Sequence, residues 1–300
     1  MCQIQGKMKQ IILILTFILT APSLCNAQQK RALLVGISKY HSYGYKVWDN
    51  IHGAEDVALL TPELKKKGFS IQTLINEQAT YQGIIDSLNK LIAASKKGDV
   101  IYLHFSCHGQ PVEDGLNGNL KDEKDGWDES IVPIDAGKVY GASGYKGDKH
   151  LTDDELNGYV SKLRKKIGPE GMLYVAMDAC HAGTSFREDE TIRGTNEGLT
   201  QKPGNTYNPP ESTIKHIVFK KGKGLAHVLY LEACKSYECN AEIIIKGEEY
   251  GSLSYNIWHA LRVMPDLDKN VSEFRNNVEY STKQEGRWPS NQTLVKESSF

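Results

Sequence analysis

The segment "DVIYLHFSCHGQP" at residues 99–111 gives the strongest indication of the fold. It starts with apolar residues that do not alternate with polar ones, as expected for a parallel strand buried on both faces. It ends with Cys107 and His108 side by side, followed by Gly109. A second segment, "MLYVAMDACHAG" at residues 172–183, runs in the same way into Cys180 and His181. Two strands that end in the same pair of reactive residues predict a shared site at one edge of a sheet.

The rest of the chain alternates between strand-like and helix-like segments. Further strands are predicted at 32–38, 70–75, 225–233 and, as a short last strand, near 292–295. Helices are predicted at 49–68, 79–98, 151–168, 250–264 and 271–284, where apolar residues recur at helical spacing. This order predicts an α/β fold, with a mostly parallel sheet of about six strands and helices on both faces. In such sheets ligands bind beyond the carboxyl ends of the strands.

Composition limits the class of protein. The chain has 300 residues, which suits one large domain, and its formal net charge is -1. A general nucleic-acid binder would be basic, so no nucleic-acid partner is expected. Two polar stretches, 113–150 and 187–224, are predicted as long loops, and loops of that length commonly carry function.

Residues 1–27 are predicted to be a secretory signal peptide. Lys7 and Lys9 precede the apolar run "IILILTFILTA", and Ala27 is a suitable cleavage position. The run is short for a retained membrane anchor, which is the alternative. We therefore expect an exported protein, periplasmic or secreted, that is not bound to a membrane after the signal is removed. Residues 28–300 would form the functional domain.

The cysteines and histidines at the two strand ends suit nucleophilic catalysis. A thiolate is the nucleophile, and it needs an imidazole to take its proton and N–H donors for the oxyanion. Either Cys180 with His108 or Cys107 with His181 could form the pair. Gly109 favours the first, because a glycine there lets a backbone amide approach the substrate. Zinc binding by these four residues is a rival hypothesis that no ligand spacing supports. The other mature-chain cysteines, Cys234 and Cys239, are predicted to be small buried residues rather than a disulfide.

These motifs resemble the caspase-like cysteine peptidases, and the metacaspase branch in particular. "HFSCHGQ" is similar to the S-x-H-G element of that family and "YVAMDACHAG" to its D-x-C-H-[SA]-G element. "ALLVGISKY", "DGWDESIVPID", "LTDDEL" and "LYLEACKSYECNAE" resemble further family segments, so the likeness covers about residues 31–262. The resemblance implies a caspase-like fold with a large part at about 28–186, the loop 187–224 and a small part at 225–300. It also implies His108 as general base, Cys180 as nucleophile, and the amides of Gly109 and Cys180 as the oxyanion hole.

A carboxylate close to the nucleophile predicts the substrate. Asp178 points to the same side of its strand as Cys180, because strand side chains alternate. A carboxylate there would raise the pKa of the thiol unless a substrate cation lies between them. Metacaspases that resemble this chain cleave after Arg or Lys. The resemblance implies Asp178, Asp56 and Ser106 as lining residues of the pocket, although the segment around Asp56 is one residue shorter than the family pattern. The expected partner is a peptide or protein with Arg or Lys before the cleaved bond.

The chemistry itself requires no cofactor, but the resemblance implies calcium as an activator. Asp153 and Asp154 in "LTDDEL" match two calcium-binding positions, and Asp128 is a third candidate. Two observations oppose this. Arg187 stands where the family often has an acid, and Asp153 also suits the first turn of a helix.

The loop 187–224 is rich in basic residues, so an enzyme that selects them could cut itself there. These residues are Arg187, Arg193, Lys202, Lys215, Lys220, Lys221 and Lys223. Two other hypotheses stay open. One is a caspase-like binding scaffold without activity, and the other is a peptidase of the clostripain type.

Overall fold

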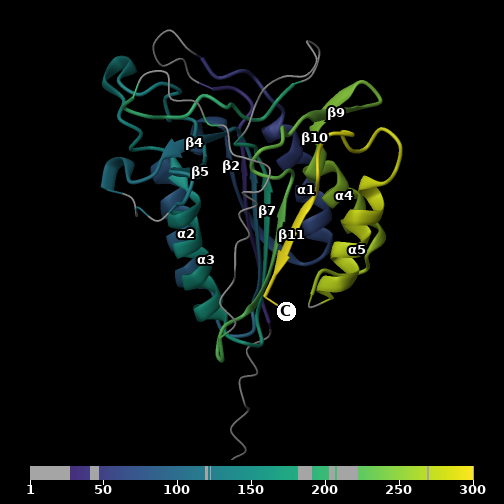
Figure 1. Cartoon of the computed structure of the whole chain (residues 1–300). Coiled ribbons are helices and arrows are strands. Elements are labelled where there is room, and N and C mark those ends of the chain that lie inside the picture. The colour runs from purple at the N-terminus through teal and green to yellow at the C-terminus, as the bar shows by residue number, and fades with distance from the viewer. Residues whose placement is uncertain are drawn as a thin grey trace, which may run out of the picture.

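The computed structural model describes residues 28–40, 47–118, 121, 123–181, 191–202, 207, 222–268 and 270–299. They form a central six-stranded sheet in the order β11-β8-β7-β3-β1-β2, seen nearly edge-on in Figure 1. The strands β1, β2, β3, β7 and β8 are parallel, and β11 runs antiparallel to β8 at one edge. The bounds are β1 Lys30–Gly36, β2 Phe69–Ile75, β3 Val100–Ser106, β7 Met172–Asp178, β8 His227–Glu232 and β11 Val295–Ser298.

Helices cover both faces of this sheet. α2 (Tyr81–Ala94) and α3 (Asp153–Ile167) lie on one face, and α1 (Gly53–Lys66), α4 (Ser252–Val263) and α5 (Val271–Thr282) on the other (Figure 1). Each face packs its own apolar core against its helices. The predicted fold class is therefore confirmed.

The two strands that carry the Cys-His pairs are the most deeply buried part of the sheet. Every residue of β3 and of β7 is buried, which explains why their sequences lack polar alternation. Their helical neighbours begin at side-chain caps. Thr80 Oγ1 accepts a hydrogen bond from Gly83 N at 3.0 Å, and Thr152 Oγ1 accepts one from Glu155 N at 3.4 Å.

The predicted loop 113–150 is wrong in part, because it contains a strand. β5 (Trp127–Ile131) pairs antiparallel with β4 (Gly109–Glu113) and with the short β6 (Leu151–Thr152). A hairpin of β9 (Glu242–Ile245) and β10 (Glu248–Gly251) was also not predicted. Both small sheets lie at the upper end of the molecule in Figure 1, around the carboxyl ends of the parallel strands.

Several predictions about the termini and loops fall outside the described residues. They include the signal peptide at 1–27 and the segments 182–190, 203–206 and 208–221 of the second loop region. Among the helices that the structure describes, none is both long enough and apolar enough to cross a membrane.

Candidate active site

The two Cys-His segments lie on neighbouring strands and end side by side. In the β3–β7 pair, Ser106 stands opposite Asp178. His108 and Cys180, each two residues further along, therefore leave the same edge of the sheet. The shared register explains why one strand can supply an imidazole and the other a sulfur to one place.

His108 is held as a neutral base. Its ring stacks on Trp48, with ring centres 5.0 Å apart, and lies 5.0 Å from the ring of Tyr40. Nε2 lies 2.9 Å from the carbonyl oxygen of Asp49 and so carries the proton that it donates. Burial lowers the pKa of His108 to about 4. Nδ1 is buried and makes no hydrogen bond to the part of the chain that the structure describes, so its lone pair is left to accept a proton.

The thiol of Cys180 is fully buried in this state. Its Sγ donates a hydrogen bond to the carbonyl oxygen of Glu238 at 2.8 Å. The neighbouring thiol of Cys234 has its pKa raised, first by its contact with Cys180 and then by burial. The sulfur would have to turn away from Glu238 before it could share a proton with His108.

The alternative pair, Cys107 with His181, is less suited to catalysis. Cys107 lies within the apolar core, and burial raises the pKa of its thiol to about 12. Within the described chain, the ligating atoms of Cys107, His108, Cys180 and His181 do not converge into a metal cluster. Cys234 and Cys239 are buried and form no disulfide, as predicted.

Two backbone amides form a binding site for an oxygen atom. The N–H groups of Gly109 and Cys180 both donate to one carbonyl oxygen, that of Arg193, at 3.1 Å each. A Cβ atom at position 109 would lie 2.3 Å from the carbonyl oxygen of Cys180, so only glycine permits this approach. The geometry fits the predicted oxyanion hole.

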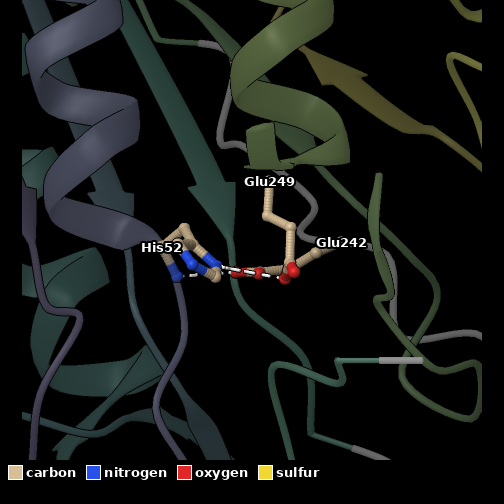
Figure 2. Close-up of side chains that lie close together, drawn as sticks. All are labelled: His52, Glu242 and Glu249. Atoms are coloured by element: carbon tan, nitrogen blue, oxygen red, sulfur yellow. Dashed lines mark hydrogen bonds and ion pairs between the residues drawn. The ribbon is translucent and has the colours of Figure 1, made fainter. Parts of the chain in front are cut away.

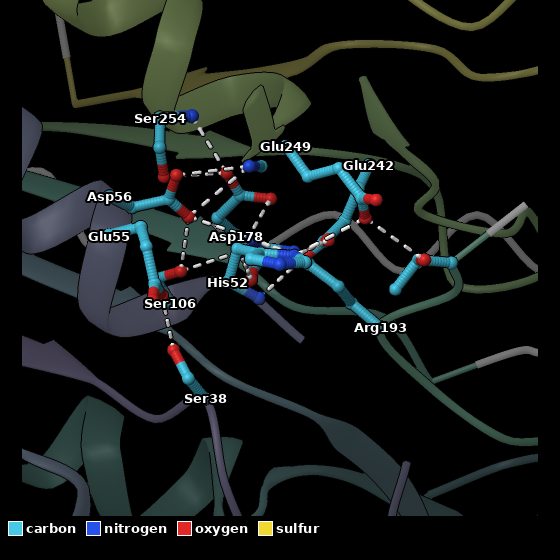
Figure 3. Close-up of polar contacts among 12 residues, drawn as sticks. Ser38, His52, Glu55, Asp56, Ser106, Asp178, Arg193, Glu242, Glu249 and Ser254 are labelled. Atoms are coloured by element: carbon cyan, nitrogen blue, oxygen red, sulfur yellow. Dashed lines mark hydrogen bonds and ion pairs between the residues drawn. The ribbon is translucent and has the colours of Figure 1, made fainter. Parts of the chain in front are cut away.

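The three residues predicted to line a specificity pocket come together from three elements. Asp56 lies in the first turn of α1, Ser106 ends β3 and Asp178 ends β7, and all three are fully buried. Ser106 Oγ donates to Asp56 Oδ2 at 2.7 Å, and the amide of Gly251 donates to Asp56 Oδ1 at 3.0 Å. Asp178 Oδ2 accepts from the amide of Ser254 at 2.7 Å. Figure 3 shows these groups around one centre.

The side chain of Arg193 fills that centre. One guanidinium nitrogen lies 2.8 Å from Asp56 Oδ2 and 2.6 Å from Glu242 Oε1. The other donates to Ser106 Oγ at 2.5 Å and lies 3.7 Å from Asp178 Oδ1. Arg193 is fully buried, so the pocket encloses a cation in a ring of acids (Figure 3).

The acids around Arg193 ionise unequally. Burial raises the pKa of Asp56 to about 7, and the charge of Arg193 offsets only part of that effect. Burial would also raise the pKa of Asp178, but Arg193 and hydrogen bonds from Asn240 and Ser254 outweigh it and lower that pKa. Burial opposes the charge of Arg193, but the surrounding carboxylates raise its pKa further above the ordinary value. The pocket is therefore suited to a permanent cation.

A histidine lies at the outer wall of the pocket. His52 Nδ1 is 2.5 Å from Glu242 Oε2 and 3.4 Å from Glu249 Oε2 (Figure 2). Burial lowers the pKa of His52, but the hydrogen bond and charge of Glu242 outweigh this and raise it. Glu242 thus joins His52 to Arg193 through its two carboxylate oxygens.

The predicted calcium ligands are not gathered in the same way. Asp128 is buried in β5, while Asp153 and Asp154 begin α3. Within the described chain, the carboxylate oxygens of these three residues do not converge as a set of metal ligands. Asp153 instead lines a cavity of about 260 Å³ together with Glu129 and Glu232. Calcium dependence therefore stays a prediction.

Sequence reasoning missed two parts of this site. Glu242 was not predicted, although it is the last residue of the segment "LYLEACKSYECNAE" that was matched to the family. Arg193 was predicted only as one basic residue of a loop, and its place in the pocket was not foreseen. The available signal was the predicted pair of carboxylates, Asp56 and Asp178, because two buried acids in one pocket need a cation as partner.

Comparison with solved structures defines the class of fold. Caspase-1 from Spodoptera frugiperda has a TM-score of 0.50 and 12% identity, over 90% of this chain and 86% of that one. A crystal structure from Geobacter sulfurreducens has a TM-score of 0.60 and 21% identity, over 90% of this chain and 93% of that one. The fold is caspase-like.

Sequence comparison identifies the family within that class. The family model described as "Metacaspase, peptidase C14 domain" matches residues 30–188. The chain therefore belongs to the metacaspase family of cysteine-type peptidases. Metacaspase-1B of Neurospora crassa is 25% identical over 289 residues, covering 81% of this chain and 61% of that protein. Metacaspase-1B of Neosartorya fischeri is 29% identical over 259 residues, covering 76% and 55%. The chain thus spans about three-fifths of the length of these relatives.

Proposed function

We propose that this protein is a cysteine endopeptidase that cleaves peptide bonds after Arg or Lys, with Cys180 as nucleophile and His108 as general base. One observation carries the proposal. A buried guanidinium is ion-paired with Asp56 and Glu242, and the same residue places its carbonyl oxygen between the amides of Gly109 and Cys180. A basic substrate residue bound in that way would present its scissile carbonyl to the thiol.

The proposed reaction needs the Cys180 side chain to turn toward His108. Nδ1 of His108 accepts the thiol proton once Cys180 turns from Glu238, and the thiolate attacks the carbonyl carbon. The two amides stabilise the oxyanion. The C–N bond breaks as the leaving amine takes the proton from His108. Water, deprotonated by His108, then hydrolyses the thioester, releasing the carboxylate and restoring the thiol.

A positional peptide library tests the specificity. We expect cleavage after Arg or Lys and no cleavage of the matched Asp peptide. Asp178→Ala should reduce the preference for a basic residue more than it reduces alkylation of Cys180. Equal turnover of the Arg and Asp peptides would exclude the pocket assignment.

Three further features belong to this proposal. The enzyme would be exported, with residues 1–27 removed as a signal peptide. Calcium would act as an activator and not in the chemistry, which the same library tests with and without added Ca²⁺. The chain would also cut itself within 187–224, a region in which Lys202 is 75% exposed.

The second candidate is a binding scaffold without activity. The observation that favours it is the complete burial of the Cys180 thiol and its hydrogen bond to Glu238. Alkylation with an iodoacetamide probe discriminates between the two, because a scaffold would show no selectively reactive Cys180. We expect selective labelling of Cys180 in the Arg193→Gln variant, in which residue 193 no longer forms ion pairs with Asp56 and Glu242.

A further inference from the structure

The residues His52, Glu242 and Glu249 form a cluster of metal-ligating side chains apart from the proposed catalytic pair. His52 directly precedes α1, Glu242 begins β9 and Glu249 lies in β10, so three elements meet at this point (Figure 2). His52 Nδ1 and one carboxylate oxygen of each glutamate lie within 4.8 Å of one another. A divalent ion held by three protein ligands needs donor atoms that face one point in this way.

Glu242 is held in the orientation that a metal ligand requires. Its side chain is buried, and its Oε1 accepts from the backbone amide of His52 at 2.8 Å and from Arg193 Nε at 2.9 Å. Its Oε2 faces the cluster, and among the described residues it contacts only the ring nitrogen of His52. Carboxylates that bind metals are commonly fixed by hydrogen bonds from neighbouring groups, as Oε1 is here.

The other two ligands can adjust, and water can reach them. The side chains of His52 and Glu249 are each 36% exposed, and Glu249 Oε2 accepts a hydrogen bond from the hydroxyl of Thr191 at 3.3 Å. Both residues line a cavity of about 360 Å³, to which Glu55 and Glu248 also contribute, so an approaching ion meets a negative surface. This room permits a water molecule as fourth ligand, which a zinc site with three protein ligands commonly keeps.

The donor atoms select a class of metal. One imidazole nitrogen and two carboxylate oxygens suit Zn²⁺ and similar transition metals, whereas Ca²⁺ and Mg²⁺ are bound by oxygen atoms. Ligands about 2.1 Å from a tetrahedral ion lie about 3.4 Å from one another. His52 Nδ1 already lies 3.4 Å from Glu249 Oε2, and its 2.5 Å contact with Glu242 Oε2 is a hydrogen bond that the ion would replace.

We propose that His52, Glu242 and Glu249 bind a divalent transition-metal ion, with Zn²⁺ as the best fit, at the outer wall of the proposed specificity pocket. The site does not depend on the peptidase function, but its effect on a basic substrate rests on that function. The two oxygens of Glu242 share one negative charge, so an ion on Oε2 weakens the attraction of Oε1 for a guanidinium in the pocket. Binding of the metal and binding of a basic residue therefore oppose each other, each by the same factor.

Zinc titration of the full chain tests the site, with Cys180→Ala as the parent so that this thiol cannot bind the ion. Competition with a chromophoric chelator should show one equivalent of Zn²⁺ on the parent. Adding His52→Gln should weaken this binding at least about 100-fold, because a ligand itself is lost, and Glu249→Gln should weaken it at least about tenfold. His227→Gln, at an exposed histidine of β8, is the matched control and should bind like the parent.

Two results of this titration would overturn the site: no binding of zinc by the parent, or equal binding by the parent and by the His52→Gln chain. Since His52 and Glu249 are both partly exposed, a loss of binding in their variants would not come from a disrupted core. X-ray absorption of the zinc-loaded parent excludes a cysteine ligand. We expect only nitrogen and oxygen neighbours at about 2.0–2.1 Å, and a sulfur neighbour at about 2.3 Å would overturn the assignment.

Peptide cleavage tests the effect on the pocket. In the chain with Cys180 intact, zinc should raise KM for an Arg peptide, and His52→Gln should remove this rise. Zinc bound at the Cys180 thiol would instead inhibit both proteins alike, and that result would overturn the coupling to the pocket. If neither protein cleaves the peptide, the peptidase proposal and the coupling fail together, while the titration decides the metal site by itself.

Discussion

Asp56 is the residue that should make substrate binding depend on pH. Burial raises its pKa to about 7, so it is mostly charged above that pH and mostly neutral below it. His108, whose pKa is lowered to about 4, stays neutral throughout the range from pH 6 to pH 8. Protonation of Asp56 would remove one partner of the substrate cation. The affinity for basic substrates should therefore decrease as the pH falls.

We expect kcat/KM for an Arg peptide to be lower at pH 6 than at pH 8, because protonation of Asp56 removes a negative charge from the pocket. Asp56→Asn should have a low value that changes little across this range. Steady-state kinetics on the wild type and on the Asp56→Asn variant measure kcat/KM at each pH. A wild-type profile that is flat, or one that the Asn variant reproduces, would contradict the role of Asp56.

The backbone amide of Gly109 depends on the absence of a side chain at that position. In Gly109→Ala the new Cβ atom would lie 2.3 Å from the carbonyl oxygen of Cys180, so the amide that faces the oxyanion must shift. We expect kcat for an Arg peptide to fall about 100-fold, as for loss of one oxyanion donor. Gly158→Ala in α3 is the control, because its Cβ atom would meet nothing within 4 Å. That control should keep full activity and gain up to about 1 kcal/mol of stability.

At the scale of elements, the start of α3 depends on the side chain of Thr152. Its Oγ1 accepts from the amide of Glu155, which otherwise has no partner within the helix. Thr152→Ala should lower the free energy of unfolding by about 1 kcal/mol and leave peptide cleavage unchanged. Urea denaturation measures this. The same substitution at Thr282, in the last turn of α5, removes no N-cap and should have a smaller effect; an equal loss at both positions would refute the capping argument.

Strand prediction succeeded where burial dominates the sequence and failed where pairing is local. β3 and β7 could be predicted because every position is buried and apolar side chains fill both faces. β5 has the sequence WDESI, and its acidic residues are typical of a loop. It is a strand because it pairs with β4 and β6. The β9–β10 hairpin turns at Lys246 and Gly247, which both have positive φ as in a two-residue turn, a conformation that the structure shows and the sequence did not.

The candidate site was predictable to the extent that residues follow strand ends. Cys180, His108 and Asp178 do so, and a parallel sheet brings such ends together. Glu242 reaches the same centre from β9, in a hairpin that the sequence did not reveal. The position of Arg193 could not be predicted, because it depends on how a polar segment lies across the folded sheet.

Arg193 also stabilises the whole folded molecule, because it is the buried counter-ion of several carboxylates. Asp56, Asp178 and Glu242 are almost fully buried, and Arg193 is the cation that they share at the centre of the pocket. In a Cys180→Ala background, which keeps the chain whole, Arg193→Gln should lower the free energy of unfolding by about 3–5 kcal/mol. Adding Asp56→Asn should restore part of that loss, because one uncompensated carboxylate is removed.

The pH dependence of this loss has a definite sign. Without Arg193 the buried carboxylates have raised pKa values in the folded state, so the folded chain binds more protons than the unfolded chain. The Arg193→Gln chain should therefore regain stability as the pH falls from neutral toward 5, as followed by chemical denaturation at several pH values. A loss that stays the same at every pH would mean that Arg193 stabilises the fold by packing and not by charge.

The segment 191–194 belongs to the same molecule as the site that it fills. Its local concentration is set by the chain that joins it to Cys180 and not by the amount of protein in solution. Dilution would therefore not unblock the enzyme, and conversion of the intact form should follow first-order kinetics with one half-life at every protein concentration. The rate of this conversion would then be a property of the single molecule and independent of its concentration.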